Sequence, residues 1–346
     1  MNANKIISPD NKCFDYMGRI DFENPERPMF IWAGSNTQTV FTGKSLSVIV
    51  RNYAFQKDAH FGVVIDGVFH KIFLKNSTDD EIYTICDNLE NGEHTLEIIK
   101  TLAGYNYFEF YGIIVDEHAK VRNPEHKYDL NIEVYGDSVS AGEVVEALYY
   151  EGQCDPPNHA NKLDNSYYAY PQMLGRMLNA RVHDNAQGGI ALLDGTGWFN
   201  AGNLTGMESC YDKLEYVPYY KQKPWDFSRF TPDFVIFAIG QNDNHPDPDC
   251  VRNPEYRAKW ENKYIEIIRD LMGKYPNAVF ISLMTVLRHD IVWDDILDEI
   301  CREINSERFV RFRFSRNAAA TYGHPRATEQ AEMATELAEF IRKIMA

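Results

Sequence analysis

Short hydrophobic runs separated by turn residues fill the first third of the chain, a pattern typical of antiparallel β structure. The runs at 61–65 and 68–73 are joined by Asp66-Gly67, a strong short-range hairpin signal. Thr39-Val40-Phe41-Thr42 and the run at 45–50 are joined by Gly43-Lys44 and predict strand, turn and strand. Further strands are expected at 93–100 and 107–115. We therefore predict that residues 1–117 form an all-β sandwich or jelly-roll domain.

A polar segment with Pro124 and charges of both signs follows at 118–129, and we interpret it as a linker. Beyond it, near-continuous apolar runs alternate with amphipathic stretches, which indicates buried parallel strands separated by helices. The segment 131–135 and the runs at 233–239, 278–283 and 309–312 are the expected strands, and the expected helices lie at 166–179, 256–275, 294–305 and 327–344. We therefore predict that residues 130–346 form a three-layer α/β domain with a parallel, flavodoxin-like sheet.

Charge and hydropathy narrow the range of partners. The 346-residue chain carries a formal net charge of -16, which argues against a nucleic-acid partner or an anionic membrane surface. No segment approaches the roughly 20 apolar residues of a membrane span. The composition, 44% hydrophobic and 25% charged, is that of an ordinary globular protein, and it does not indicate an oligomeric state.

The six cysteines are scattered along the chain and include no CxxC pair. In a chain of this size they are expected to be free thiols in a reducing compartment, and they indicate neither a disulfide framework nor a zinc site. The first ten residues have no apolar signal core. We therefore expect a cytoplasmic protein, although a chain trimmed of a signal peptide would look the same.

Four short polar blocks of the second domain carry the candidate chemistry, and each follows an expected strand. They are Gly136-Asp137-Ser138, Asn185-Ala186-Gln187-Gly188-Gly189-Ile190, Gly240-Gln241-Asn242-Asp243 and Gly323-His324-Pro325. Because the carboxyl ends of parallel strands meet at one sheet edge, we expect the four blocks to lie together. A serine at such an edge can be a nucleophile if a base reaches it. Taken alone, the first block would more often be an ordinary turn, since Gly, Asp and Ser are common turn residues.

Taken together, the ordered blocks resemble the SGNH (GDSL-type) hydrolases, over the segment from about Asn131 to the C-terminus. The first domain makes the resemblance more specific, because several of its short segments look like the jelly-roll domain of carbohydrate esterase family 2. These segments lie at 7–11, 18–22, 32–35, 41–46 and 91–95. The resemblance implies a serine esterase that removes acetyl groups from sugars of plant polysaccharides such as xylan or mannan, with no metal or organic cofactor.

The resemblance also assigns roles to individual residues. Ser138 would attack the acetyl carbonyl, and His324 would take the serine proton and deliver it to the departing sugar oxygen. The oxyanion of the tetrahedral intermediate would be held by the N–H groups of Ser138 and Gly189 and by the side-chain amide of Asn242. The second block is ambiguous, and Gly188 could take the place of Gly189.

One position departs from the family pattern. Most SGNH enzymes carry Asp three residues before the catalytic histidine, where this chain has Thr321. Three interpretations follow: a Ser–His dyad whose ring is held by a backbone carbonyl, a distant acid such as Asp290 or Asp294 that folds in, or a degenerate site. In addition, Gly323 stands where related esterases often carry Trp, so the wall that faces the sugar is not predicted.

Some neighbouring residues receive less specific interpretations. Trp198 could stack on a sugar ring or pack as part of a lid, and Tyr322 is a second candidate for sugar contact. His245 follows a mid-sheet strand too closely to be the usual base. Asp243 and the two aspartates after it are expected in a solvated loop, because their spacing matches no EF-hand.

The function that the sequence favours is therefore a carbohydrate O-acetyl esterase. If the protein is cytoplasmic, acetylated oligosaccharides are expected as substrates in place of polymer. Two alternatives stay open: an SGNH esterase or lipase of other acyl specificity, and a non-catalytic sugar-binding protein that kept the fold. The sequence does not indicate which sugar or which hydroxyl is deacetylated, nor whether the β domain binds glycan.

Overall fold

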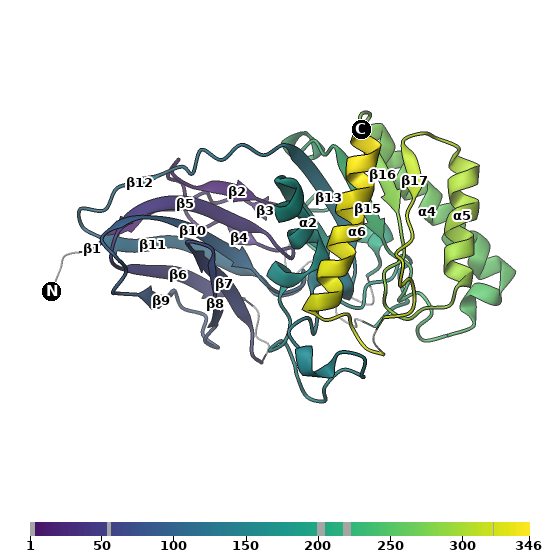
Figure 1. Cartoon of the computed structure of the whole chain (residues 1–346), viewed down its shortest axis with the longest axis horizontal. Coiled ribbons are helices and arrows are strands. Elements are labelled where there is room, and N and C mark those ends of the chain that lie inside the picture. The colour runs from purple at the N-terminus through teal and green to yellow at the C-terminus, as the bar shows by residue number, and fades with distance from the viewer. Residues whose placement is uncertain (1–3, 54–56, 199–204, 217–222, 321) are drawn as a thin grey trace.

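The computed structural model describes residues 4–53, 57–198, 205–216, 223–320 and 322–346. Two parts lie side by side along the long axis (Figure 1). The N-terminal part, drawn in purple and blue, is made of strands. The C-terminal part, drawn in teal to yellow, contains a sheet covered by helices. This division follows the change in hydrophobic pattern along the sequence.

The N-terminal part is a sandwich of two antiparallel sheets, which confirms the expected fold. One sheet has the order β3-β4-β11-β6-β9, with β1 paired to β11, and the other has the order β12-β5-β10-β7-β8, with β2 paired to β5. The strands are β1 (Asn4–Ile7), β2 (Asp15–Met17), β3 (Ile20–Asp21), β4 (Met29–Phe30), β5 (Asn36–Gly43), β6 (Leu46–Asn52), β7 (His60–Ile65), β8 (Val68–Phe73), β9 (Glu81–Cys86), β10 (Gly92–Lys100), β11 (Phe108–Asp116) and β12 (Val121–Arg122).

One predicted local feature of the sandwich is confirmed, and two differ from the prediction. The hairpin at Asp66-Gly67 is confirmed, since β7 and β8 pair in register. The strands on either side of Gly43-Lys44 form as expected, but β5 and β6 belong to opposite sheets, so the turn between them crosses the sandwich. The expected linker at 118–129 is only partly a linker, because Val121 and Arg122 pair with β5 as β12.

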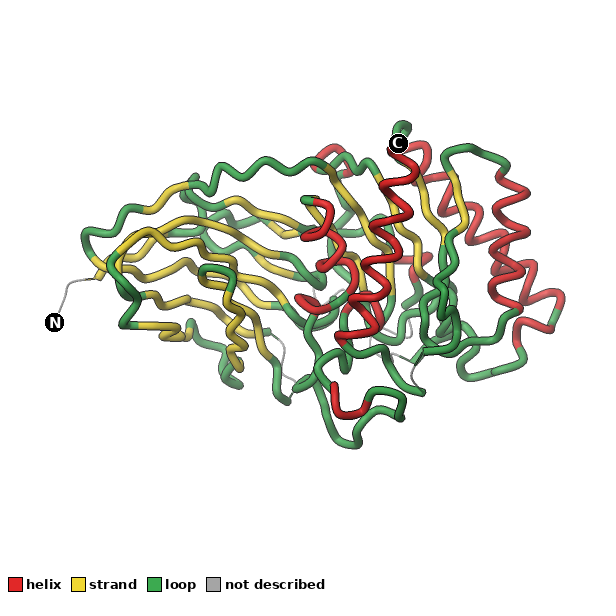
Figure 2. The backbone as a smooth tube through the Cα atoms, viewed as in Figure 1, coloured by secondary structure: helices red, strands yellow, loops and turns green. Residues whose placement is uncertain are grey.

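The C-terminal part has five parallel strands in the order β14-β13-β15-β16-β17, which is the flavodoxin-like order 2-1-3-4-5. The strands are β13 (Leu130–Gly136), β14 (Ala180–Ala186), β15 (Phe234–Ala238), β16 (Val279–Ser282) and β17 (Phe309–Arg311). The α-helices are α1 (Ser138–Ala141), α2 (Tyr170–Leu178), α3 (Met207–Cys210), α4 (Pro254–Lys274), α5 (Val292–Ile304) and α6 (Ala327–Met345). Figure 2 shows how the helices flank the strands, as predicted for three layers.

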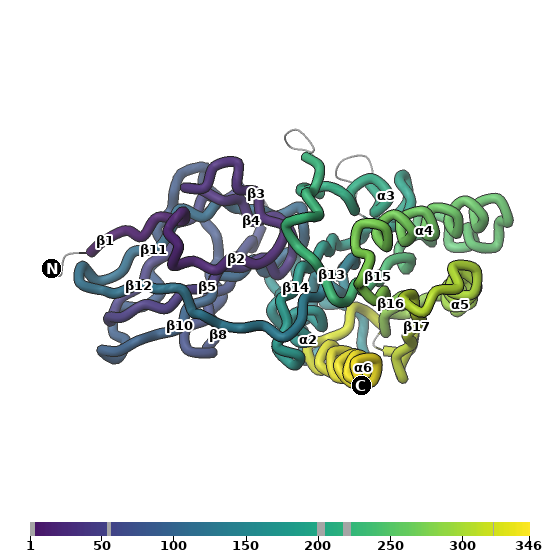
Figure 3. The backbone as a smooth tube through the Cα atoms, turned by 90° about the horizontal axis from the view of Figure 1, so that it is seen from above, coloured from purple at the N-terminus to yellow at the C-terminus, as the bar shows by residue number. Residues whose placement is uncertain are grey.

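Alternation along β13 explains the two cores of this domain. Ile132 and Val134 point into a core shared with α2 and α6, while Tyr135 points into a core shared with α4 and α5. Seen from above, α2 and α6 lie on one side of the sheet and α4 lies on the other (Figure 3). The strand is buried on both faces, as expected for a central parallel strand, and its one buried charged residue is Glu133.

The sandwich is joined to the α/β domain through buried contacts. Arg19 of the sandwich donates hydrogen bonds from Nη2 to Glu133 at 2.9 Å and to the hydroxyl of Tyr135 at 2.6 Å. Both members of the Arg19–Glu133 ion pair are fully buried. Trp32 packs in the same core as α4 and donates its indole N–H to the carbonyl of Leu214 at 2.7 Å. The two domains therefore share one core on this side of the sheet.

The cysteines among the described residues are all free thiols, as the sequence predicted. Within the described ranges, no helix is long and apolar enough to cross a membrane.

Candidate active site

Ser138 lies where the central strand turns into a helix. β13 ends at Gly136, and Ser138 is the first residue of α1. Asp137 between them caps the helix, because its Oδ1 accepts a hydrogen bond from the N–H of Val139 at 3.0 Å. A Cβ at Gly136 would lie 2.1 Å from Oγ of Ser140, so only glycine fits this turn. The turn leaves Ser138 at the carboxyl edge of the sheet.

Asp137 also connects the first block to the third. Its Oδ2 accepts hydrogen bonds from Nε2 of Gln241 at 2.6 Å and from Nδ2 of Asn242 at 3.3 Å. Burial raises the pKa of Asp137, and these hydrogen bonds oppose the rise. The Gln241 carbonyl oxygen in turn accepts from the hydroxyl of Thr285 at 2.5 Å. The end of β15 is therefore tied to the serine turn on one side and to the end of β16 on the other.

The second and third blocks are joined at the expected oxyanion site. Nδ2 of Asn242 donates to the carbonyl of Ile190 at 3.0 Å. The carboxylate of Asp243 accepts the N–H groups of Leu192 at 2.9 Å and Leu193 at 3.2 Å. Gly189 has φ +71°, a conformation that favours glycine. Sequence reasoning expected Asp243 in a solvated loop; this was wrong, because it is buried and holds two loops together.

His324 is held by a carboxylate that the sequence analysis did not name. Nδ1 of His324 lies 2.7 Å from Oδ2 of Asp155, and the N–H of His324 donates to Oδ1 of Asp155 at 3.0 Å. Burial alone would lower the pKa of His324, but Asp155, Glu143 and Asp164 together raise it above its usual range. Conversely, hydrogen bonds from His324 and Arg326 hold the pKa of Asp155 well below its usual range, against the effect of burial. The pair therefore favours a charged imidazolium next to an ionised aspartate.

Arg326 fixes the loop that carries Asp155. Its fully buried guanidinium donates through Nη1 to Oδ1 of Asp155 and to the carbonyl of His324, both at 2.7 Å. Through Nη2 it donates to the carbonyls of Tyr150 and Gln153, both at 3.3 Å. One side chain at the start of α6 therefore positions the acid and the histidine relative to each other.

Gly323 makes room for this arrangement. A Cβ at position 323 would lie 2.2 Å from Oδ1 of Asp155. A side chain as large as the Trp that related esterases often carry there would fill the space that Asp155 occupies. The glycine before the histidine and the acid from a distant loop are therefore parts of one arrangement.

The histidine also lies beside the chain that follows the serine. The N–H of Ala327 donates to the carbonyl of Val145 at 2.8 Å, and the amide of Gln330 donates to the carbonyl of Val139 at 2.9 Å. Among the described residues, however, no hydrogen bond joins the Ser138 hydroxyl to His324. Nε2 of His324 lies 3.8 Å from Oε2 of Glu143. Catalytic hydrogen bonds are often formed only once substrate is bound, so this geometry does not exclude the pair.

Comparison with known proteins shows what the chain is similar to. A family model described as carbohydrate esterase 2 N-terminal matches residues 16–124. The cellulase/esterase CelE of Acetivibrio thermocellus is 27% identical over 299 residues, which cover 86% of this chain and 33% of that protein. The acetylxylan esterase / glucomannan deacetylase of Cellvibrio japonicus is 22% identical over 359 residues, which cover 100% of this chain and 92% of that protein. The chain therefore spans about a third of the length of CelE.

A solved structure of a family two carbohydrate esterase from Clostridium thermocellum, in complex with cellohexaose, superposes with a TM-score of 0.76 at 23% identity, covering 96% of this chain and 99% of that one. Both domains are included in this match. Residues 16–124 therefore match the N-terminal model of carbohydrate esterase family 2, and the chain as a whole has the fold of the family two carbohydrate esterases.

The structure corrects the interpretations of what orients the histidine. A distant acid does fold in, but it is Asp155. Asp290 is paired with Arg252 at 2.5 Å, and Asp294 is paired with His289 at 2.9 Å. The interpretation in which a backbone carbonyl holds the ring was wrong as well, because Nδ1 faces a carboxylate. Thr321 lies outside the described residues.

The two candidate sugar-contacting residues are exposed. The ring of Trp198 is 64% exposed and stacks on the ring of His245 with centroids 3.6 Å apart. The backbone N–H of Trp198 donates to the carbonyl of Gly189 at 2.9 Å, which places Trp198 next to the second block. Tyr322 is 70% exposed. His324 therefore has a carboxylate partner in Asp155, whereas the ring of His245 stacks on Trp198.

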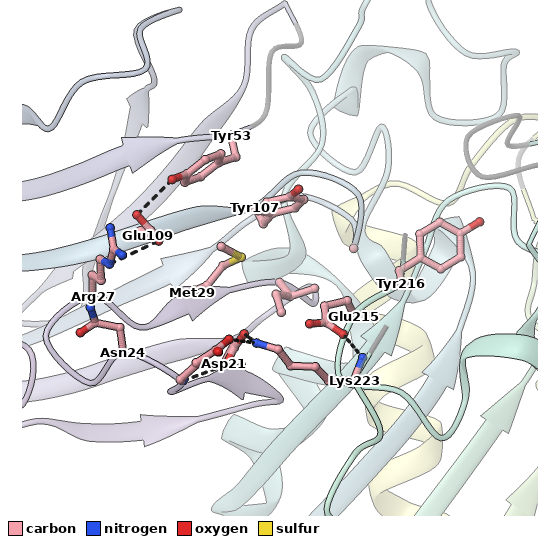
Figure 4. Close-up of a pocket in the computed structure, with 13 residues that line it drawn as sticks. Asp21, Asn24, Arg27, Met29, Tyr53, Tyr107, Glu109, Glu215, Tyr216 and Lys223 are labelled. Atoms are coloured by element: carbon pink, nitrogen blue, oxygen red, sulfur yellow. Dashed lines mark hydrogen bonds and ion pairs between the residues drawn. The ribbon is translucent and has the colours of Figure 1, made fainter. Parts of the chain in front are cut away.

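Two cavities adjoin the domain junction. One, of about 400 Å³, lies next to the histidine and is lined by Lys57, Tyr105, Glu143, His159, Ala160, Asn161 and Asp164. The other, of about 600 Å³, lies between the sandwich and the segment around Lys223, where Lys223 pairs with Asp21 at 2.6 Å (Figure 4). The described residues that line the second cavity include neither Ser138 nor His324. Among the described residues, no cluster of side chains could hold a metal ion.

Proposed function

We propose that this protein is a carbohydrate O-acetyl esterase that uses Ser138, His324 and Asp155 as a catalytic triad. The observation that carries the proposal is the carboxylate of Asp155 on Nδ1 of His324 at 2.7 Å. A carboxylate there keeps the proton on Nδ1, so Nε2 is free to act as a base. His94 and His289 also have carboxylate partners, but His324 differs from them because it lies beside Glu143, whose N–H is bonded to the carbonyl of Ser138.

The reaction would proceed in two steps. Ser138 Oγ attacks the acetyl carbonyl while Nε2 of His324 takes the serine proton, and the same nitrogen then delivers that proton to the departing sugar oxygen. This leaves an acetyl group on Ser138. Water, deprotonated by His324, then attacks the acetyl group and releases acetate. Asp155 stabilises the imidazolium formed in each half-reaction.

The oxyanion would be held by the N–H groups of Ser138 and Gly189 and by the amide of Asn242. Asn242 uses one N–H on Ile190 at 3.0 Å, and its contact with Asp137 at 3.3 Å is the weaker one. The N–H of Asn242 that contacts Asp137 is therefore the one that can turn toward an oxyanion. Loss of one such donor lowers kcat by about 10²–10³-fold in comparable sites.

The names of the relatives support the choice of substrate class. They include an acetylxylan esterase / glucomannan deacetylase, and a related structure holds cellohexaose. We therefore propose acetylated oligosaccharides derived from xylan or mannan as substrates. Trp198 and Tyr322 expose aromatic rings near the catalytic blocks, where a pyranose could stack.

The test is release of acetate from acetylated xylo- and manno-oligosaccharides, with 4-nitrophenyl acetate and butyrate measured alongside. We expect the wild type to prefer acetate over butyrate, and Ser138→Ala and His324→Ala to abolish turnover. His70→Ala, which changes an exposed histidine of the sandwich, serves as the matched control. A preference for butyrate would favour an SGNH esterase of other acyl specificity. A wild type that binds these sugars without turnover would instead be a sugar-binding protein.

A further inference from the structure

Glu143 lies at the centre of the catalytic blocks, although no step of the triad reaction uses it. Its N–H donates to the carbonyl of Ser138 at 2.9 Å, so it belongs to the turn that carries the nucleophile. Its Oε2 lies 3.8 Å from Nε2 of His324. A Cβ at Gly188 would lie 1.6 Å from its Oε1, so the carboxylate rests directly on the second block. Glu143 therefore stands between the base and the expected oxyanion site.

This carboxylate has no hydrogen-bond donor of its own in the described part of the chain. Its surroundings are mostly acidic, since Asp164, Asp137 and Asp155 face it and His324 is its cationic neighbour. Burial and the charge of Asp164 raise the pKa of Glu143 to about 7, and His324 opposes the rise. The Glu143 side chain is 25% exposed beside the expected base, so a hydroxyl of an incoming ligand can reach its carboxylate and donate to it.

The cavity beside Glu143 is built by both domains. Tyr105 of the sandwich donates from its hydroxyl to Oδ1 of Asn161 at 3.2 Å, and Asn161 donates from Nδ2 to the carbonyl of Lys57 at 3.1 Å. Asp164 on the far side accepts the N–H of Val144 at 2.8 Å. The cavity, of about 400 Å³, is therefore walled by polar groups, and Glu143 in its wall lies 3.8 Å from Nε2 of His324.

The step in which His324 protonates the departing sugar oxygen indicates which part of the substrate enters this cavity. Nε2 of His324 must come within about 3 Å of the departing oxygen to protonate it. The carboxylate of Glu143, which lies 3.8 Å from the same nitrogen, is then within reach of a group on the carbon next to that oxygen. An ionised carboxylate only accepts hydrogen bonds, so it favours a hydroxyl there and repels an anionic group.

We propose that Glu143 determines leaving-group specificity by accepting a hydrogen bond from the sugar hydroxyl adjacent to the acetylated one. The cavity lined by Tyr105 and Asp164 is then the subsite for the sugar that departs. This inference rests on the proposed esterase function and adds to it a substrate class: acetylated neutral sugars with a free neighbouring hydroxyl. Acetate esters of alcohols without such a hydroxyl, and of acidic sugars, are disfavoured.

The experiment compares kcat/KM for a monoacetylated methyl xyloside with kcat/KM for 4-nitrophenyl acetate, whose leaving group has no hydroxyl. In Glu143→Ala we expect the ratio of the two values to fall at least tenfold, mainly through KM for the sugar ester. Glu143→Gln, which keeps the shape and a hydrogen-bonding carbonyl, should recover part of the loss. Glu151→Gln, on an exposed neighbouring loop, is the control. An equal loss for both esters in both variants would overturn the proposal, because Glu143 would then act on the catalytic residues themselves.

A binding measurement separates this proposal from the esterase assignment. Calorimetry with the monoacetylated methyl xyloside would compare Ser138→Ala with Ser138→Ala/Glu143→Ala. At least tenfold weaker binding by the double variant supports Glu143 as a sugar contact even if the wild type hydrolyses neither ester, a result that would refute only the esterase. Equal binding by the two variants would refute the role of Glu143.

Discussion

The carboxylate of Asp155 lies 2.7 Å from Nδ1 of His324, although the two residues are 169 positions apart in the chain. SGNH enzymes usually supply this acid from three residues before the histidine. Here it comes from the loop after the serine helix, and Arg326 and Gly323 make the replacement possible. Arg326 holds the loop in place by hydrogen bonding to Asp155, and Gly323 leaves space for the carboxylate.

Asp155→Asn should lower kcat by about 10⁴-fold, the loss seen when comparable orienting carboxylates become amides. Because Asp155 raises the pKa of His324, the acid limb of the pH profile of the residual activity should also move to lower pH. Steady-state kinetics across pH measure both effects. Asp290→Asn, which changes an acid paired with Arg252, is the control and should behave as wild type. If Asp155→Asn keeps full kcat, the acid does not orient the base.

Gly323→Ala should lower kcat by about 10²-fold, because displacement of a catalytic group by about 1 Å has that effect. The added Cβ would lie 2.2 Å from Oδ1 of Asp155 and would push the acid away from His324. Gly273→Ala in α4 is the matched control, since nothing lies within 4 Å of the added Cβ there. Thermal denaturation should show both variants folded, so a kcat loss confined to position 323 is attributed to the acid. Unchanged kcat would show that the loop can yield without disturbing the histidine.

Arg19→Met should destabilise the protein by about 3–5 kcal/mol, the range for removal of one partner of a buried ion pair. The variant leaves Glu133 buried without its cation on the central strand. Urea unfolding measures the effect, and Arg19→Met/Glu133→Gln should recover part of the loss because the buried charge is gone. Arg122→Met, which breaks an exposed pair with Glu93, should leave the unfolding free energy almost unchanged. A similar cost for both arginines would contradict a domain junction held by the buried pair.

Glu143→Gln should stabilise the fold by an amount that grows as pH rises from about 4 toward 7. In the folded protein the pKa of Glu143 is raised to about 7, whereas an unfolded glutamate titrates near about 4.3. Between these values the folded state binds more protons than the unfolded state, so the wild type loses stability as pH rises, and the neutral amide does not. The difference in Tm between variant and wild type, measured from pH 4 to 8, checks this. A difference that stays constant across this range would mean that the pKa is not raised.

The local pattern of hydrophobic and polar residues was sufficient to predict most of the helices and strands. The Asp66-Gly67 hairpin, the buried strand β15 and the amphipathic helix α6 each follow from residues that are neighbours in sequence. The order of the catalytic blocks also follows, since strands of a parallel sheet bring their carboxyl ends to one edge. The sequence alone therefore determined a β-sandwich before a flavodoxin-like domain, and it indicated Ser138 and His324 as the pair to examine.

Tertiary structure decided which groups surround that pair. Asp155 lies in a loop with no periodic pattern, and only the fold brings it to His324, through a buried arginine that local sequence does not single out. Asp243 likewise has the spacing of a loop residue, and only the packing of two loops shows that it is buried. Side-chain partners across long loops depend on the path of the whole chain, which hydrophobic periodicity does not encode. For the same reason the position of Glu143 beside the base became visible only in three dimensions.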